Sequence, residues 1–281
     1  MAISDITNQH NDGSARSDAA QKRARDAAAI VRTEDTGPDK KHKVALNAIA
    51  AEYVCPLTRE LPIDPVMAKD GQIYERSEIL KWLARNATSP VTREPMGTEL
   101  IPAPLFRNTI EKLVSSGAID GEIAEAWKGK LAQEEEVKEM RARAEGGDEM
   151  APWQLGMWYQ NGTKGLAKDA AQARAWFERS AAADDPRGLA MFGQYLLCGL
   201  SGPQDSALGL VNLTQAADSW DVAAYILGNT FFHGYHGLPK DPVRARPWLE
   251  KVVRGRFYLL NLSDIGRARA AEMLRELDQE E

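Results

Sequence analysis

The pattern of hydrophobic and polar residues divides the chain into regions of different character. Up to about residue 43 it is polar and has no aromatic residue. From 45 to 118 short apolar runs alternate with turn residues, which is typical of a small α+β module. Beyond about 120 the apolar residues recur at helical spacing, which predicts an all-α region. Because residues 1–44 have too few apolar side chains to form a core, we expect them to be disordered.

The region 45–118 contains signals for a hairpin and two helices. Asp70-Gly71 lies between two apolar pairs, which predicts a tight turn between two strands. Ser77 is the expected N-cap of a helix that Asn86 ends. A short strand at Leu100-Ile101 and a second helix follow. The apolar residues that support these elements are Val66, Met67, Ile73 and Tyr74 in the strands, Ile79, Leu80, Trp82 and Leu83 in the first helix, and Leu105 to Val114 in the second.

One long helix is predicted from Asp120 to Glu145. Asp120 is its expected N-cap, and Gly146-Gly147 ends it. Its apolar residues follow helical spacing, and Glu134-Glu135-Glu136 forms a solvated face. We interpret residues 119–147 as a linker helix between the two halves of the chain.

Residues 148–255 repeat with a period in the mid-thirties. Asp169, Asp205 and Asp241 recur 36 residues apart. Such a period is typical of helical hairpins stacked as a solenoid. Gly and Ala at recurring positions would let the helices approach closely, and residues 256–281 would form a terminal capping helix. The units begin with Leu155-Gly156, Phe192-Gly193 and Leu227-Gly228.

Composition narrows the classes of partner. The chain has 281 residues, 43% hydrophobic and 27% charged, with a net charge of −6. This mild negative charge, without a Lys- or Arg-rich stripe, argues against a nucleic-acid partner. No apolar run reaches the about 18 residues of a membrane span, and the N-terminus has no secretory apolar segment. We therefore expect a cytoplasmic protein.

Metal and disulfide chemistry are not expected. Cys55 and Cys198 lie in separate regions, and the four histidines are scattered. These residues supply neither a disulfide framework nor the four ligands of a structural zinc site. His233 and His236 lie three residues apart in a Gly-containing turn without further ligands, so we interpret them as turn residues. No cofactor is predicted.

Three segments of the first module together resemble the U-box of ubiquitin ligases, the metal-free relative of the RING domain. They are Glu52 to Val66 with Cys-Pro-Leu-Thr and Asp-Pro-Val, Asp70 to Arg76 with the Asp-Gly turn, and Ser89 to Pro95 with Ser-Pro-Val-Thr-Arg. The resemblance implies a protein that holds a ubiquitin-charged conjugating enzyme (E2) against a substrate and forms no covalent ubiquitin intermediate itself.

The resemblance also implies roles for individual residues. Leu57 and Pro90 match the hydrophobic contacts to the conjugating enzyme, and Trp82 matches the edge of the docking groove. Arg93 matches the basic residue that holds ubiquitin ready for attack, which is the catalytic role. Three of these residues have a simpler interpretation: Leu57 and Trp82 as core, and Pro90 as a residue that stiffens its turn.

Two further expectations follow for this module. Cys55 would be structural, because no histidine lies near it to activate a nucleophile. The family usually has an asparagine where this chain has Ala103, so loop rigidity and the strength of ligase activity are in question. Hydrogen bonds and ion pairs would hold the metal-free core, for which the available residues are Glu60, Asp64, Lys69, Arg76 and Glu94.

The repeats resemble Sel1-like repeats, relatives of the tetratricopeptide repeat. The first unit, from Ala151 to Trp176, and the third, from Ala224 to Trp248, match well. The middle unit is degenerate, with Leu196 where an aromatic residue is usual and Asn212 where a tryptophan recurs. We expect the concave face of the array to bind a protein substrate, although most aromatic residues in such arrays are core. The candidate substrate-binding residues are Trp158, Tyr159, Tyr195 and Phe231.

These features predict an α+β U-box module followed by an all-α solenoid of Sel1-like hairpins, acting as a ubiquitin ligase. The alternative is a non-catalytic repeat scaffold with an inactive docking module. A third interpretation is a bacterial repeat protein that binds peptides or peptidoglycan-related partners. The pairing of domains suggests a bacterial effector, which would be secreted into the host cell cytoplasm. Residues 1–44 would then be a delivery signal rather than a plain linker.

Overall fold

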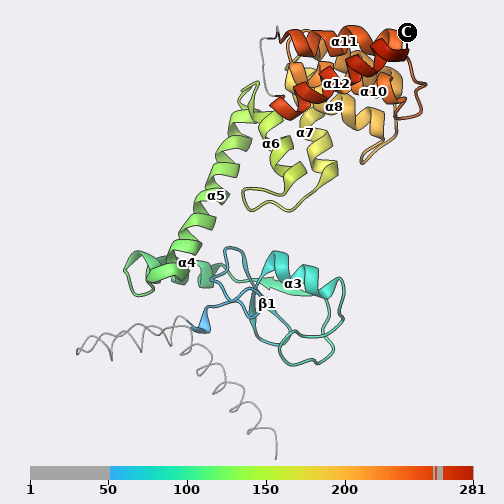
Figure 1. The fold of residues 1–281 in the computed structure, drawn as a ribbon. Helices are drawn as coiled ribbons and strands as arrows, with labels where there is room; N and C mark the ends of the chain where they lie inside the picture. The colour runs from blue at the N-terminus through green and yellow to red at the C-terminus, as the bar shows by residue number, and fades with distance from the viewer. Residues whose placement is uncertain (1–50, 256, 258–261, 281) are drawn as a thin grey trace, which may run out of the picture. The chain divides into compact units, whose positions relative to one another are not determined.

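The computed structural model describes residues 51–255, 257 and 262–280. It divides into two compact units, Met1–Ala132 and Gln133–Glu281, whose elements are labelled in Figure 1. The disordered segment and the delivery signal predicted for residues 1–44 lie outside the described residues. Each unit is described by itself below.

Within the described part of the first unit, a three-stranded antiparallel sheet in the order β2-β1-β3 carries two helices. Val66 pairs with Tyr74 on one side and with Pro102 on the other. The predicted Asp70-Gly71 turn is confirmed: Gly71 has φ 73° and donates its amide proton to the Ala68 carbonyl. The elements are β1 Pro65–Ala68, β2 Ile73–Glu75, α3 Arg76–Leu83, β3 Leu100–Pro102 and α4 Pro104–Ser115.

The start of α3 differs from the prediction. The helix begins at Arg76, so Ser77 lies inside it and the expectation of Ser77 as N-cap is wrong. Glu75 holds the N-cap position without a side-chain cap, because its carboxylate accepts hydrogen bonds from Ile63 and Asp64 of a distant loop. A tertiary contact has taken the place of a local one.

Two hydrophobic clusters form the core of this unit. The first cluster lies between the sheet and α3 and contains Cys55, Val66, Ala68, Tyr74, Ile79, Leu83 and Met96. The second cluster lies around α4 and contains Leu61, Ile110, Val114, Ile119, Ala124 and Trp127. The last two residues belong to α5, Gly121–Glu145, the long helix predicted from the sequence. Its first half is therefore part of the core of the first unit.

The described helices of the second unit pair into hairpins in chain order, each helix packing against the next. The final helix, α12, packs against both α10 and α11, where the first helix of another hairpin would lie. Buried Asp221 of α10 fixes the approach to α12 by accepting from the Leu262 amide and from Arg267. The bounds are α6 Ala151–Asn161, α7 Ala170–Ala182, α8 Pro186–Cys198, α9 Ser206–Ala216, α10 Asp221–His233, α11 Pro242–Arg254 and α12 Asp264–Glu280.

The recurring aspartates and glycines explain why the hairpins repeat. Asp169, Asp205 and Asp241 are the N-caps of α7, α9 and α11, and each side chain accepts from backbone amides of the first turn. The recurring glycine allows close packing of the two helices in a hairpin. A Cβ at Gly156 would lie 2.4 Å from the ring of Phe177, so only glycine fits there.

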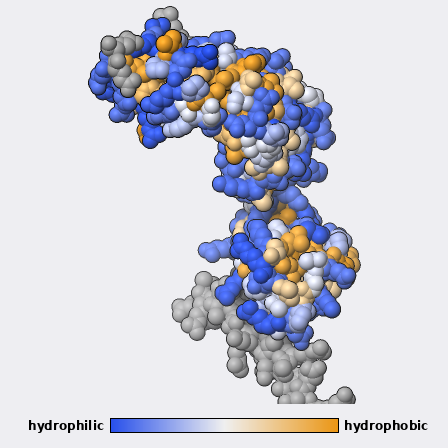
Figure 2. All heavy atoms as spheres, turned by 90° about the vertical axis from the view of Figure 1, so that its right-hand side faces the viewer, coloured by the Kyte–Doolittle hydropathy of each residue, from blue (hydrophilic) through white to orange (hydrophobic). Residues whose placement is uncertain are grey.

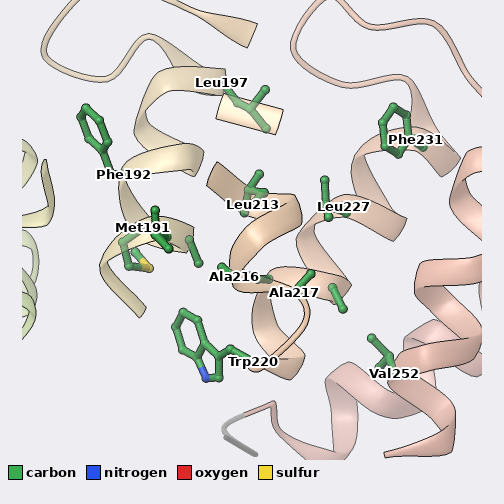
Figure 3. Close-up of a cluster of buried hydrophobic side chains, with 14 of the residues drawn as sticks. Met191, Phe192, Leu197, Leu213, Ala216, Ala217, Trp220, Leu227, Phe231 and Val252 are labelled. Atoms are coloured by element: carbon green, nitrogen blue, oxygen red, sulfur yellow. The ribbon is translucent and has the colours of Figure 1, made fainter. Parts of the chain in front are cut away.

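The degenerate middle repeat still forms a continuous core. Leu196 and Asn212, which replace the usual aromatic and tryptophan residues, are both buried. Figure 3 shows side chains of α8, α9, α10 and α11 converging, with Ala216 and Ala217 where the helices come close. Smaller side chains in this repeat are thus accommodated by packing with both neighbours.

The surface of each unit is mainly hydrophilic on the face that Figure 2 shows, with hydrophobic residues gathered in places. Among the described helices, none combines the length and the apolar character that a membrane span requires. In the first unit the exposed large hydrophobic residues are Met67, Leu80, Ile101 and Leu105.

Candidate functional site

The first loop, residues 55–64, presents Leu57 at the surface of the first unit. Its turn is closed by hydrogen bonds from the Cys55 amide to the Glu60 carbonyl, 2.9 Å, and from the Arg59 amide to the Cys55 carbonyl, 2.8 Å. Arg59 has φ 60°, a left-handed conformation. Leu57 is half-buried and packs against the first cluster with one side. It is therefore neither fully core nor fully free.

Glu75 fastens both ends of the first loop. Its carboxylate accepts from the amides of Ile63, 2.7 Å, and Asp64, 3.2 Å. Its amide donates to the sulfur of Cys55, 3.2 Å. Cys55 is fully buried, so its thiol is enclosed as the packing of a structural cysteine requires.

The second loop, residues 87–96, is organised around the hydroxyl of Ser89. This side chain is only 1% exposed. Its hydroxyl donates to Asp70, 2.5 Å, and accepts from the amides of Val91, 3.1 Å, and Thr92, 3.0 Å. Pro90 lies inside this turn and is half-buried. The hydrogen bonds of Ser89 therefore fix the conformation in which the loop presents Pro90.

Asp70 ties the second loop to the hairpin turn. The Tyr74 hydroxyl donates to the same carboxylate oxygen as Ser89, at 2.7 Å. Burial, together with the hydrogen bond to Asp70, raises the pKa of Tyr74 above its ordinary value. Asp70, Tyr74 and Ser89 were not among the predicted stabilising residues. All three lie within the quoted segments, but only the tertiary structure shows that they meet.

Trp82 lies beside this loop, and Arg93 lies within it. The indole nitrogen of Trp82 donates to the Thr88 carbonyl, 2.8 Å, and its ring is half-buried against the first cluster. The guanidinium carbon of Arg93 lies 5.8 Å from the ring centroid of Trp82, within the range of a cation–π contact. Arg93 is exposed and has φ 66°, a conformation that the sequence did not indicate.

The predicted ion pairs are found in part. Asp64 pairs with Arg76 at 2.6 Å. Glu60 pairs with Lys130 of α5, a partner outside the predicted set. Lys69 and Glu94 are exposed. This core is thus held mainly by the hydrogen bonds around Ser89 and Glu75.

Ala103 occupies the N-cap of α4 without a side-chain cap. It is buried, and its amide donates to the Pro65 carbonyl at 2.9 Å. The backbone bond fastens this position to β1, but the side chain that would cap the helix or hold a loop is missing. Ala103, which stands where the U-box family usually has an asparagine, thus lies at the start of α4.

Most of the candidate substrate-binding aromatics are core residues. Trp158, Tyr195 and Phe231 are only 6%, 3% and 7% exposed, whereas a role in substrate binding predicts accessible side chains. They face neighbouring helices: Tyr195, for example, lies 5.4 Å from Phe177 between ring centroids. Tyr159 is half-buried, and its hydroxyl accepts from Arg141 of α5.

The two histidines lie at the end of α10 and in the turn that follows, and both make contacts with neighbouring side chains. The ring of His233 stacks on Tyr235 at 4.8 Å. His236 lies 3.6 Å from the sulfur of Cys198 through its Nδ1 atom, and burial raises the pKa of that thiol. Over the part of the chain that the structure describes, no group of three or more potential metal ligands occurs.

Comparison with known proteins agrees with this geometry. The model of the U-box domain matches residues 49–117, and that of the Sel1 repeat matches residues 151–185, 187–219 and 221–251. The chain carries a U-box followed by three Sel1 repeats. The predicted fold class, a U-box followed by an α-helical repeat array, is confirmed.

The relatives share single domains with this chain. A Danio rerio protein named "WD repeat, SAM and U-box domain-containing protein 1" is 46% identical over 56 residues, 20% of this chain and 12% of the relative. An Acanthamoeba polyphaga mimivirus protein named "Probable bifunctional E2/E3 enzyme" is 39% identical over 59 residues, 21% of this chain and 4% of the relative. The chain thus spans a small part of the length of these relatives.

A solved Sel1 repeat protein from Oxalobacter formigenes is 27% identical, with a TM-score of 0.38. The match covers 49% of this chain and 98% of that one.

The U-box match ends before the second cluster is complete. It stops at residue 117, whereas Ile119, Ala124 and Trp127 fill the space beside α4. In this protein, therefore, the core around the U-box includes residues beyond the matched segment.

Proposed function

We propose that this protein is a U-box ubiquitin ligase that binds a ubiquitin-charged conjugating enzyme on the surface formed by the first loop, the second loop and α3. The observation that carries the proposal is the hydrogen-bonded framework of this surface. Glu75 and Ser89 fasten the two loops through partly buried hydrogen bonds, while Leu57 and Pro90 stay half-exposed. The mimivirus relative, named as an E2/E3 enzyme, supports the same class.

The contacts suit an interface of modest size. Leu57 and Pro90 are anchored on rigid loops, so little conformational freedom is lost when a partner covers them. Removal of such an anchor typically costs about 1–3 kcal/mol of binding energy. The exposed guanidinium of Arg93 can donate to carbonyl groups of two partners at once. Transfer would then be accelerated by orientation of the thioester rather than by a protein nucleophile.

Polyubiquitin formation in a reconstituted reaction with a panel of conjugating enzymes tests this function. Leu57→Ala and Pro90→Ala should each lose transfer in parallel with binding and remain folded. The matched control is Leu105→Ala, a leucine on α4 that is 77% exposed and outside both loops. Full activity of Leu57→Ala at limiting conjugating enzyme would show that the docking surface lies elsewhere.

The second candidate function is a non-catalytic scaffold that uses the U-box only for docking. The observation in its favour is Ala103, which leaves the N-cap of α4 without a side-chain cap. On this alternative the protein binds conjugating enzymes and forms no ubiquitin chains with any of them. The same panel, combined with a binding titration, separates the two functions.

For the substrate, we propose the first helices of the repeats as the binding surface. Met157, Gln194 and Asn229 each follow the glycine that packs against the second helix, and all three are half-buried. They thus repeat one position along the array. Tyr159 stays a prediction, because it is partly accessible. The three buried aromatics are excluded as direct contacts in this conformation.

A triple alanine variant at Met157, Gln194 and Asn229 should lose the substrate and retain autoubiquitination by the U-box. Substrates captured by the intact chain but not by this variant identify the recognised class. Unchanged capture would place recognition on another face.

Because the activity requires ubiquitin, we propose that the protein works in a eukaryotic cytoplasm, reached by secretion if the source is bacterial.

A further inference from the structure

Helix α5 makes a buried contact with the first loop of the U-box. The indole nitrogen of Trp127 donates to the carbonyl of Pro62, 65 residues earlier, at 3.2 Å. Trp127 is only 3% exposed and packs with Leu61 and Ile110 in the second cluster. The contact combines a hydrogen bond with burial of a large aromatic ring, and it reaches the loop that presents Leu57.

The same face of α5 makes a second contact with this loop. Lys130, three residues after Trp127, pairs with the carboxylate of Glu60. Residues three apart on a helix lie on one face. Trp127 and Lys130, on one face of α5, therefore hold Pro62 and Glu60. Both of these residues belong to the part of the first loop that follows Leu57.

These contacts can affect docking because the loop is short and internally closed. The amide of Cys55 donates to the carbonyl of Glu60, so the segment that carries Leu57 is bounded by residues that α5 and Glu75 hold. A displaced Pro62 would change the end of this segment. A surface that must be ordered at the moment of binding binds more weakly than one ordered beforehand.

We propose that Trp127 is a positioning residue of the ligase: α5 holds the first loop in the conformation that docks the conjugating enzyme. The inference rests on the proposed function. It also implies that the functional U-box module of this chain extends through Lys130, beyond the matched residues 49–117.

Trp127→Phe in the full chain is the decisive variant. It keeps an aromatic ring in the cluster but removes the N–H, which leaves the buried Pro62 carbonyl without this donor. We expect the KM for the charged conjugating enzyme to rise about tenfold while kcat stays within about twofold. A purely structural role would instead lower the amount of active protein and leave KM unchanged.

A pair of lysine variants provides the matched control. Lys130→Gln removes the contact with the loop, whereas Lys128→Gln removes an ion pair with Glu125 within α5 itself. Both lysines are partly exposed, so the effect of Lys130→Gln on KM is expected to be small, about two- to threefold. Lys128→Gln should leave KM unchanged, and an equal effect of both would contradict the inference.

Amide hydrogen exchange tests the contact without any assay of activity. Trp127→Phe should speed exchange of the hydrogen-bonded amides of Cys55 and Arg59 about tenfold. Those of Val91 and Thr92 in the second loop should keep their rates. Unchanged exchange in the first loop, or equal acceleration in both loops, would overturn the positioning role. An inactive parent would count against the proposed function instead, and the exchange result would still decide the contact.

Discussion

Ser89→Ala removes the hydroxyl on which the second loop depends. The side chain is buried and takes part in hydrogen bonds with Asp70, Val91 and Thr92. A hydrogen bond contributes about 0.5–1.5 kcal/mol net, and more when one partner is charged, as Asp70 is. Since Tyr74 still donates to Asp70 in the variant, part of the network survives. We expect the loop to lose about 2–3 kcal/mol of stability.

Amide exchange of Val91 and Thr92 measures this loss at the site itself. With a factor of ten for each 1.4 kcal/mol, their exchange should become about 30- to 140-fold faster. The affinity for a conjugating enzyme should fall in the same variant, because Pro90 lies between Ser89 and Val91. Ser77→Ala is the control, since Ser77 is exposed on α3 and its hydroxyl donates to the adjacent Glu78 at 3.4 Å. Exchange within twofold of the parent in Ser89→Ala would refute the network as the support of the loop.

Further variants and conditions test other parts of the account. Ala103→Asn should raise the urea midpoint of the U-box by an amount equivalent to about 0.5–1 kcal/mol, by capping α4; an unchanged midpoint would contradict a missing cap. The pKa of Tyr74 is raised in the folded state. The stability that this tyrosine contributes is therefore present below about pH 10 and falls as pH rises further. Urea midpoints measured between pH 9 and 11 should drop in the parent and drop less in Tyr74→Phe. Gly228→Ala should destabilise the repeats by about 1–3 kcal/mol, since its Cβ would lie 2.7 Å from Leu249. Gly129→Ala is the control, because its Cβ would meet open space, and it should not destabilise the protein. Thermal unfolding of the two variants measures the difference. A chelator should leave the melting temperature unchanged, and a stoichiometric zinc signal in purified protein would contradict this.

Local signals in the sequence predicted much of the fold. The Asp70-Gly71 turn follows from the need for positive φ. The recurring aspartates indicated the period of the repeats, and the structure adds that each of them caps a helix. The recurring Gly156 position follows from the space that a side chain would need. Each of these depends on neighbouring residues or on one close contact. The turn and the repeat period could therefore be predicted from the sequence alone.

Contacts between distant segments could not be read in the same way. Glu75 lies at the N-cap of α3, but its carboxylate accepts from the Ile63 amide of the first loop and not from its own helix. Because this contact is tertiary, the sequence pattern wrongly indicated Ser77 as the N-cap. Trp127 looked like one more apolar residue of a linker helix, but it binds Pro62. For the repeats, spacing indicated which positions are aromatic and not which side chains are covered, as buried Tyr195 shows.

The proposed function requires that the U-box accelerates ubiquitin transfer by orienting a charged conjugating enzyme. Single-turnover discharge of a preformed enzyme–ubiquitin thioester to free lysine, with a parallel binding titration, measures this step directly. We expect faster discharge with the parent chain and, for Arg93→Ala, a discharge rate that falls more than the affinity. Binding without acceleration by the parent for every conjugating enzyme tested, or a thiol-sensitive ubiquitin adduct on Cys55, would contradict it.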